Sequence, residues 1–194
     1  MNHLVLVLGL LVFLGIHSAS IAAPQWRLAT MGRLGEKKWK GLFSLASAVG
    51  LALIVVGYGL ARREPVPLYL PPLFLRHLSL LLMVPVFPLL IATYFPGRIS
   101  AAAKHPMLLS VKLWAAAHLL ANGNLGDVLL FGSFLAWAVA DRISVKRRPA
   151  VERHDVPAVR SGMNDVIVIV GGLAAYALTL FWLHRVLIGV SPLP

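Results

Sequence analysis

The sequence predicts an all-α protein, a polytopic bundle of about six transmembrane helices with both termini on the outer side of the membrane. Hydrophobic residues make up 59% of the 194 residues and charged residues only 13%, a balance far from that of soluble domains. Six apolar stretches follow one another along the chain. Thirteen Lys and Arg residues fall in the connections on one side and four on the other, which favours six spans with the positive side inside.

The first apolar stretch resembles a signal peptide, but it has no Lys or Arg before it and five after it. We therefore expect a retained span. The second stretch ends at Arg62 and Arg63, before a proline-rich loop. Pro85 and Pro88 lie inside the third and should kink it, freeing carbonyls that neighbouring helices must satisfy.

Pro106 opens the fourth stretch, because proline suits the first position of a helix. A basic segment, residues 142–162, follows the fifth and is expected to be a surface loop. The sixth leads to a short outer tail. We expect one domain, residues 1–194, whose spans cover residues 4–23, 41–61, 73–94, 106–121, 128–140 and 166–187.

The net charge of +11 would suit a nucleic-acid partner, yet the cations are confined to short connections between apolar runs. We therefore expect a lipid bilayer as the partner, and no nucleic acid. The absence of cysteine excludes disulfides, thiolate metal sites and cysteine nucleophiles. Residues 1–121 hold only two carboxylates, and no nucleotide-binding or hydrolase motif is found. Histidine is thus the leading candidate for metal or haem chemistry.

Two of the seven histidines, His17 and His118, lie within predicted spans. Neutral imidazoles on two helices can hold a haem inside a bundle, and hydrogen-bonded packing histidines are the alternative reading. A second pairing joins His3 with His17 and His105 with His118, because each pair falls near one stripe of its helix. That spacing would suit two haems, one near each face.

Trp114 shares a helix face with His118 and is a candidate to pack on the macrocycle. Lys112 shares a side with His105 at the helix mouth, where it would bind a haem propionate or anionic lipid, or snorkel to the surface. Asp127 is expected to cap the fifth helix. The other histidines are expected at interfaces or in solvent: His77, His154 and His184.

Several short motifs resemble the NnrU family over essentially the whole chain: His17-Ser18, Lys104-His105-Pro106, Trp114, Ala117-His118 and Gly123-Asn124. The resemblance implies a multi-pass protein of the bacterial inner membrane that is associated with denitrification, where the family is linked to nitrite and nitric oxide reductases. The same domain is similar to the plastid 15-cis-zeta-carotene isomerase, a haem-b enzyme. Its two haem ligands fall on His17 and His118 of this sequence.

The chain departs from that isomerase at Ala19, where the isomerase has glycine, and at Lys104, where it has arginine. Neither change touches a ligand. The His-Pro pair also resembles isoprenylcysteine-type methyltransferases, whose acidic C-terminal cofactor-binding part has no counterpart here.

The functional expectation is one haem b between the first and fourth helices, in a redox or accessory component linked to denitrification. One alternative is a haem-dependent cis–trans isomerase of an apolar polyene such as 15-cis-zeta-carotene, and another is a haem-free membrane assembly factor. The first reading calls for a redox partner and the second for an apolar substrate.

Overall fold

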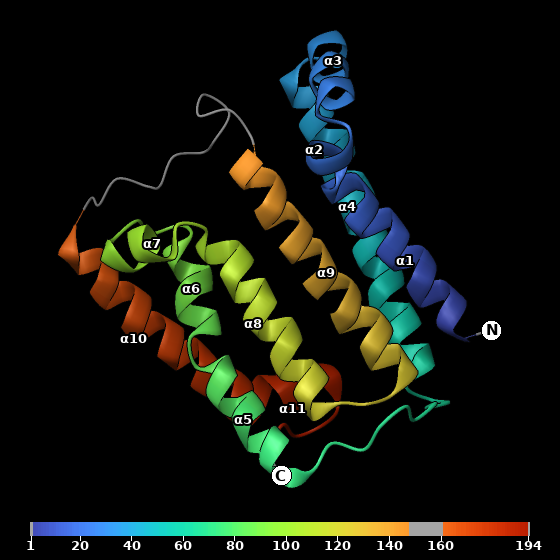
Figure 1. Cartoon of the computed structure of the whole chain (residues 1–194), viewed down its shortest axis with the longest axis vertical. Coiled ribbons are helices and arrows are strands. Elements are labelled where there is room, and N and C mark those ends of the chain that lie inside the picture. The colour runs from blue at the N-terminus through green and yellow to red at the C-terminus, as the bar shows by residue number, and fades with distance from the viewer. Residues whose placement is uncertain (1, 148–160, 194) are drawn as a thin grey trace. The chain divides into compact units, whose positions relative to one another are not determined.

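The computed structural model describes residues 2–147 and 161–193, and every regular element in these two ranges is helical (Figure 1). The only extended pairing within them is an isolated bridge between Pro67 and Asn124. The prediction of an all-α fold is therefore confirmed. The basic segment after the fifth stretch, with His154, lies mostly outside the described residues.

The helices follow the apolar stretches of the sequence. Their bounds are α1 Asn2–His17, α2 Ala19–Ala22, α3 Pro24–Leu34, α4 Glu36–Ala61, α5 Leu73–Met83, α6 Val86–Ala92, α7 Arg98–Ala103, α8 Pro106–Ala121, α9 Leu125–Arg147, α10 Gly162–Leu178, the π-helical η2 Thr179–Leu183 and α11 His184–Ile188.

Most helix limits agree with the expected spans, and the first and the fifth differ. The expected fifth span, residues 128–140, lies within the longer α9, which ends at Arg147, so residues 142–147 of the expected surface loop are helical. Helix α8 begins at Pro106 and ends at Ala121, as the sequence predicts. The expected first span, residues 4–23, divides at Ser18, whose N–H reaches the carbonyls of both Leu14 and Gly15. His17 is consequently the last residue of α1 rather than an interior residue of a longer helix.

Within the described residues, four helical segments are long and apolar enough to cross a membrane: Glu36–Ala61, Leu73–Ala92, Leu125–Arg147 and Gly162–Ile188. Two further apolar helices, α1 and α8, are shorter. The protein thus has the character of a membrane protein, with four spanning helices by length and composition. The expected number of six is not confirmed.

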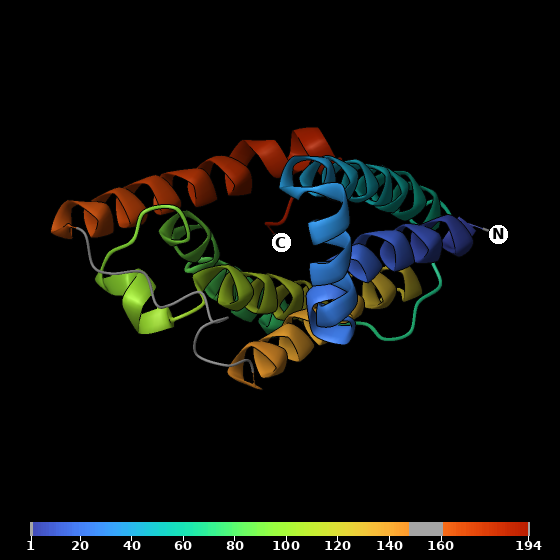
Figure 2. The same ribbon diagram turned by 90° about the horizontal axis from the view of Figure 1, so that it is seen from above.

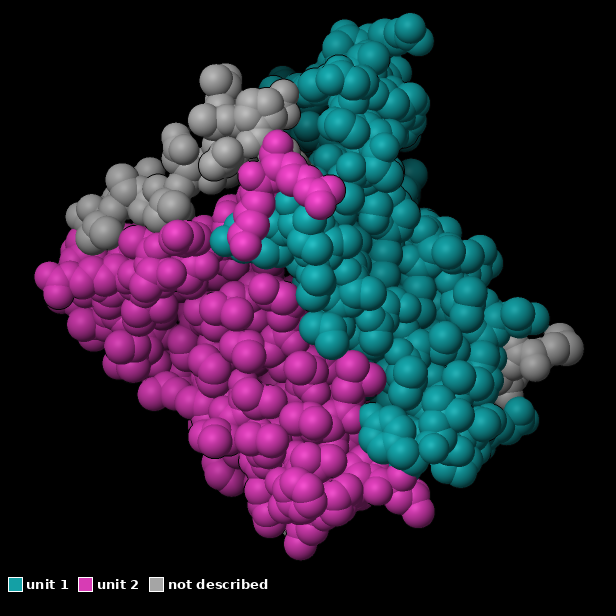
Figure 3. Space-filling model, viewed as in Figure 1, with its two compact units in different colours: residues 1–69, 123–144 teal, residues 70–122, 145–194 magenta. Residues whose placement is uncertain are grey.

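The chain divides into two compact units (Figure 3), and the first contains residues 1–69 and 123–144. Here α1 packs along α4 through glycines. A Cβ atom built on Gly50 would lie 2.7 Å from the backbone nitrogen of Phe13, and one on Gly57 would overlap the backbone of Leu6. Small residues permit this close backbone approach, as in many membrane helix pairs.

In the second unit, residues 70–122 and 145–194, the prolines of the third stretch break the helix as expected. Helix α5 ends at Met83 and α6 begins at Val86. The N–H of Val84 bonds Leu81, so the carbonyl of Leu80 is left for the hydroxyl of Tyr176, 2.8 Å away on α10. Ser110 of α8 donates to the carbonyl of Val86 at 2.9 Å. Side chains of the neighbouring helices α10 and α8 thus donate hydrogen bonds to backbone carbonyls next to the break, as expected.

Two polar residues at the start of α10 hold the loop before α7. The carboxylate of Asp165 accepts from the backbone N–H groups of Arg98 and Ile99 at 3.0 and 3.1 Å. The side chain of Asn164 donates to the carbonyl of Pro96 at 2.7 Å. These bonds tie α7 to α10, and their role is structural.

Candidate functional site

His17 lies at the end of α1 inside a cluster of aromatic rings. Its ring stacks on Phe13 with centroids 4.3 Å apart and an interplanar angle of 26°. The edges of Phe43 on α4 and Trp137 on α9 approach the same imidazole, at centroid distances of 5.0 and 6.0 Å. Three helices of the first unit therefore fix the orientation of this ring.

A backbone hydrogen bond sets the tautomer of His17. Its Nδ1 lies 2.7 Å from the carbonyl oxygen of Phe13, one helical turn earlier. A carbonyl oxygen only accepts, so Nδ1 carries the hydrogen, and in the neutral ring Nε2 holds the lone pair. Histidines that bind metals usually donate their second ring nitrogen in this way, which orients the ring and raises the basicity of the ligating nitrogen.

His118 in the second unit repeats this arrangement. Its Nδ1 lies 2.8 Å from the carbonyl oxygen of Trp114, again four residues earlier. The Trp114 ring contacts the imidazole with centroids 5.3 Å apart, which confirms that these two residues share one face of α8. The amide of Asn122 donates to the carbonyl of His118 at 2.9 Å and ends the helix. His17 and His118 belong to different units.

Three buried polar atoms of the first unit have no hydrogen-bond partner within residues 2–147 and 161–193: Nε1 of Trp137, Oγ of Ser47 and Nε2 of His3. Trp137 contacts His17 directly. Ser47 lies on the same stripe of α4 as Phe43, which contacts His17, and Gly50, which faces Phe13. Buried polar groups normally have partners, so unpaired ones beside an oriented imidazole suit a binding role.

The remaining sequence candidates are placed as follows. His105 is the residue before the first turn of α8, without a side-chain bond that caps the helix. Lys112 is half-buried and has no ion pair in the part of the chain that the structure describes. His3 lies at the other end of α1 from His17, and its buried Nε2 also lacks a partner.

Asp127 has the structural role that the sequence suggested. It is 4% exposed, and one oxygen accepts from the hydroxyl of Tyr58 on α4 at 2.6 Å. Its other oxygen accepts from the backbone N–H and side-chain amide of Asn124, at 3.0 and 3.1 Å, which caps α9 from within its first turn. Burial, and after it the charge of Asp127, raises the pKa of Tyr69 in the neighbouring loop.

A groove of about 260 Å³ runs between α1 and α9 in the first unit. Its wall on α1 is apolar over about two turns, through Val7, Leu10, Leu11 and Leu14, and Leu129 lines it from α9. Hydroxyl groups border it at Ser18 and Ser133. Its lining is mostly apolar.

Sequence reasoning identified both imidazoles but missed the residues around His17, namely Phe13, Phe43 and Trp137. Only Phe13 carries a local signal, since it precedes His17 by one turn. Within the described ranges, no group of three or more His, Asp or Glu side chains is placed to hold a bare metal ion. A haem iron needs only two axial ligands from the protein, so this finding is compatible with haem.

A family described as NnrU protein matches residues 5–192, which is nearly the whole chain. No curated protein and no solved structure matches the sequence.

Proposed function

Because the chain belongs to the NnrU family, we propose that it binds one haem b with His17 and His118 as axial ligands. The proposal places the protein in a bacterial inner membrane, as a redox or accessory component linked to nitrite and nitric oxide reduction. When bound, a haem with two imidazole ligands supplies one-electron transfer.

One observation carries the proposal. Both imidazoles donate Nδ1–H to the carbonyl four residues earlier, so each presents Nε2 as the nitrogen with a lone pair. The protein therefore sets the tautomer and the direction of both rings before any ligand binds.

The surroundings of each ring are aromatic, as the apolar face of a macrocycle would require. Phe13, Phe43 and Trp137 gather around His17, and Trp114 lies against His118. The unpaired N–H of Trp137 and hydroxyl of Ser47 supply hydrogen bonds for a polar group such as a propionate. Lys112 lies two residues before Trp114 on α8 and has no ion pair among the described residues. It remains our candidate to bind a second propionate.

The proposed topology has six spans, with α1 and α8 crossing as shorter helices, and both termini outside. It rests on the distribution of Lys and Arg, thirteen against four. Short helices cross where the bilayer thins or other helices surround them.

The test is the absorbance spectrum of the protein purified after expression with ample haem. We expect a Soret band and its loss in both His17→Ala and His118→Ala. His77→Ala is the matched control, because His77 is exposed on α5, and it should keep full haem content. A wild-type protein without a Soret band would refute haem binding and leave the haem-free assembly factor as the function.

The apolar groove between α1 and α9 favours a second candidate, cis–trans isomerisation of an apolar polyene. The groove borders Gly15 and Ser18, next to His17, so an extended polyene would lie beside the proposed haem ligand. Carotenoid extracts of cells with and without the gene distinguish the two functions. Accumulation of a cis precursor on deletion would support the isomerase, and an unchanged carotenoid profile would leave the redox role.

A further inference from the structure

A dense cationic segment, residues 24–40, follows the first helix. It contains five Lys and Arg residues and a single carboxylate, that of Glu36. Lys40 pairs with Glu36 at 2.6 Å. The other four side chains have neither an ion pair nor a hydrogen bond in the described ranges: Arg27, Arg33, Lys37 and Lys38.

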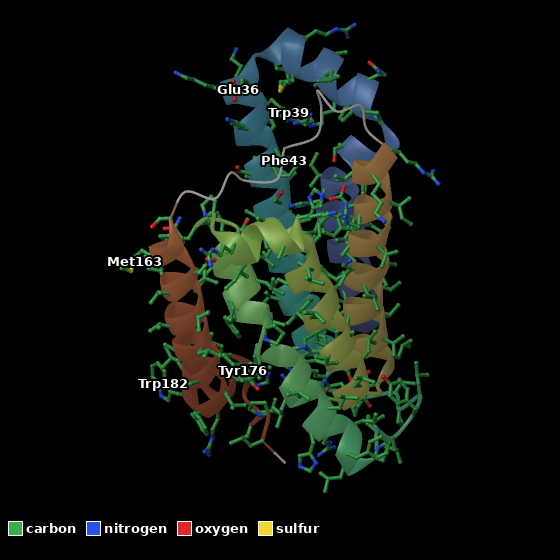
Figure 4. All side chains as sticks on the ribbon, turned by 60° about the vertical axis from the view of Figure 1, so that its left-hand side comes forward. Glu36, Trp39, Phe43, Met163, Tyr176 and Trp182 are labelled. Atoms are coloured by element: carbon green, nitrogen blue, oxygen red, sulfur yellow. The ribbon has the colours of Figure 1, made fainter. Side chains whose placement is uncertain are left out.

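Helix α3 holds the first half of this segment and lies crosswise to α4 (Figure 2). Gly35, with φ of 82°, makes the reversal between the two helices, since this backbone conformation favours glycine. Figure 4 shows α3 beyond the end of α4 that carries Glu36 and Trp39. The apolar run of α4 begins immediately afterwards at Gly41, so α3 lies at the boundary of a membrane span.

Apolar side chains accompany the cations. No residue of α3 is buried, and Trp26 and Leu28 are 54% and 42% exposed. The ring of Trp26 meets that of Trp39 edge-on, with centroids 5.9 Å apart. Tryptophan next to Lys and Arg at the end of a span is typical of the layer of lipid headgroups.

We infer that residues 24–40 form a binding site for anionic phospholipid headgroups at the membrane surface. The four unpaired cations match the negative phosphates, and Trp26 and Leu28 enter the acyl boundary beside them. An acidic protein surface could form ion pairs with the four cations. It would not provide the apolar environment that the exposed Leu28 side chain requires at the edge of a span. This inference depends on the membrane character of the chain and not on haem binding.

A single cysteine allows the site to be measured in the full chain, because the protein has none of its own. Leu28→Cys, labelled with a polarity-sensitive dye, is titrated in detergent with mixed micelles of phosphatidylglycerol or phosphatidylcholine. We expect a blue shift of the emission with phosphatidylglycerol and little change with phosphatidylcholine. Equal responses to both lipids, or full competition by inorganic phosphate, would overturn the inference.

The residues are tested by a triple variant of exposed cations, Arg33→Gln, Lys37→Gln and Lys38→Gln, in the labelled protein. It should need about a hundredfold more phosphatidylglycerol for the same shift. The matched control removes the same charge from α9 by Arg142→Gln, Lys146→Gln and Arg147→Gln, and it should behave as the wild type. If both triples weaken binding alike, the attraction is diffuse and residues 24–40 form no specific site.

A charge-preserving variant, Lys37→Arg with Lys38→Arg, tests whether weaker binding by the triple variant results from misfolding. It should retain the response to phosphatidylglycerol, and its helix content should match that of the triple variant by circular dichroism. Loss of binding in this variant would contradict recognition by charge.

Discussion

At the scale of single residues, the candidate site is defined by which polar atoms have partners. Nδ1 of His17 and of His118 each has a backbone acceptor, whereas Nε1 of Trp137 and Oγ of Ser47 are buried and have no partner among the residues that the structure describes. A packing role for His17 would not require unpaired groups beside it. A binding role gives them a purpose, because a polar ligand edge would complete their hydrogen bonds.

Trp137→Phe separates these two roles. A buried donor without a partner costs about 1–3 kcal/mol, so the variant should leave the haem-free protein equally or more stable. It should weaken haem retention, measured by transfer of haem to an acceptor protein. Trp182→Phe is the control, because Trp182 is 57% exposed and should change neither property. Unchanged haem transfer in Trp137→Phe would show that its N–H does not contact the cofactor.

The hydrogen bond from Tyr58 to the buried carboxylate of Asp127 should contribute measurably to stability. Hydrogen bonds to charged groups are worth about 1.5–3 kcal/mol, so Tyr58→Phe should lower the free energy of unfolding by about that amount. Thermal unfolding in detergent measures the loss. Tyr94→Phe, at a side chain that is 71% exposed, should leave the melting temperature unchanged. Equal melting of the two variants would contradict a stabilising role for this bond.

At the scale of helices, α1 and α4 are held together by shape more than by polar contacts. Glycines on both helices let the two backbones approach, with Gly9 facing Ile54 and Gly57 facing Leu6. Such pairing depends on the absence of side chains at a few positions. The same unit therefore offers a sharp comparison between two glycines of α4 that lie only two residues apart.

Gly57→Ala should destabilise the protein, because the added methyl group would overlap the backbone of Leu6, which cannot turn aside as a side chain would. Overpacking of this kind costs about 1–3 kcal/mol. Gly59→Ala meets nothing within 4 Å and should be neutral or slightly stabilising, since alanine is the better helix former. The difference between their melting temperatures measures the effect, and equal values would mean that α1 and α4 do not pack in this way.

At the scale of the whole molecule, the number of spans decides which segments face each side of the membrane. Four helices are long and apolar enough to cross, and α1 and α8 are shorter. With six spans, the loop after α4 lies outside and the end of α9 lies inside. If only four helices crossed, the sides on which these segments lie would change. Chemical labelling of the two segments therefore tests the number of spans.

Glu64→Cys should react with a membrane-impermeant maleimide in intact cells, and Lys146→Cys should react only after the membrane is opened. Both side chains are exposed, and the chain has no cysteine that would add background labelling. The distribution of charge is the physical reason for this orientation. Labelling of Lys146→Cys in intact cells would reverse the proposed topology or remove one of the spans.

The sequence by itself determined the helical class, the start of α8 at Pro106 and the break at Pro85, and it named His17 and His118 as candidate ligands, which stays a prediction. These features follow from hydropathy, proline geometry and residue chemistry, which act over one or two helical turns. Only the tertiary structure decided that Phe43 and Trp137 surround His17, that Tyr58 holds Asp127 and that α1 ends at His17. Such contacts depend on how distant helices pair and rotate, and nothing in the spacing along the chain specifies that rotation.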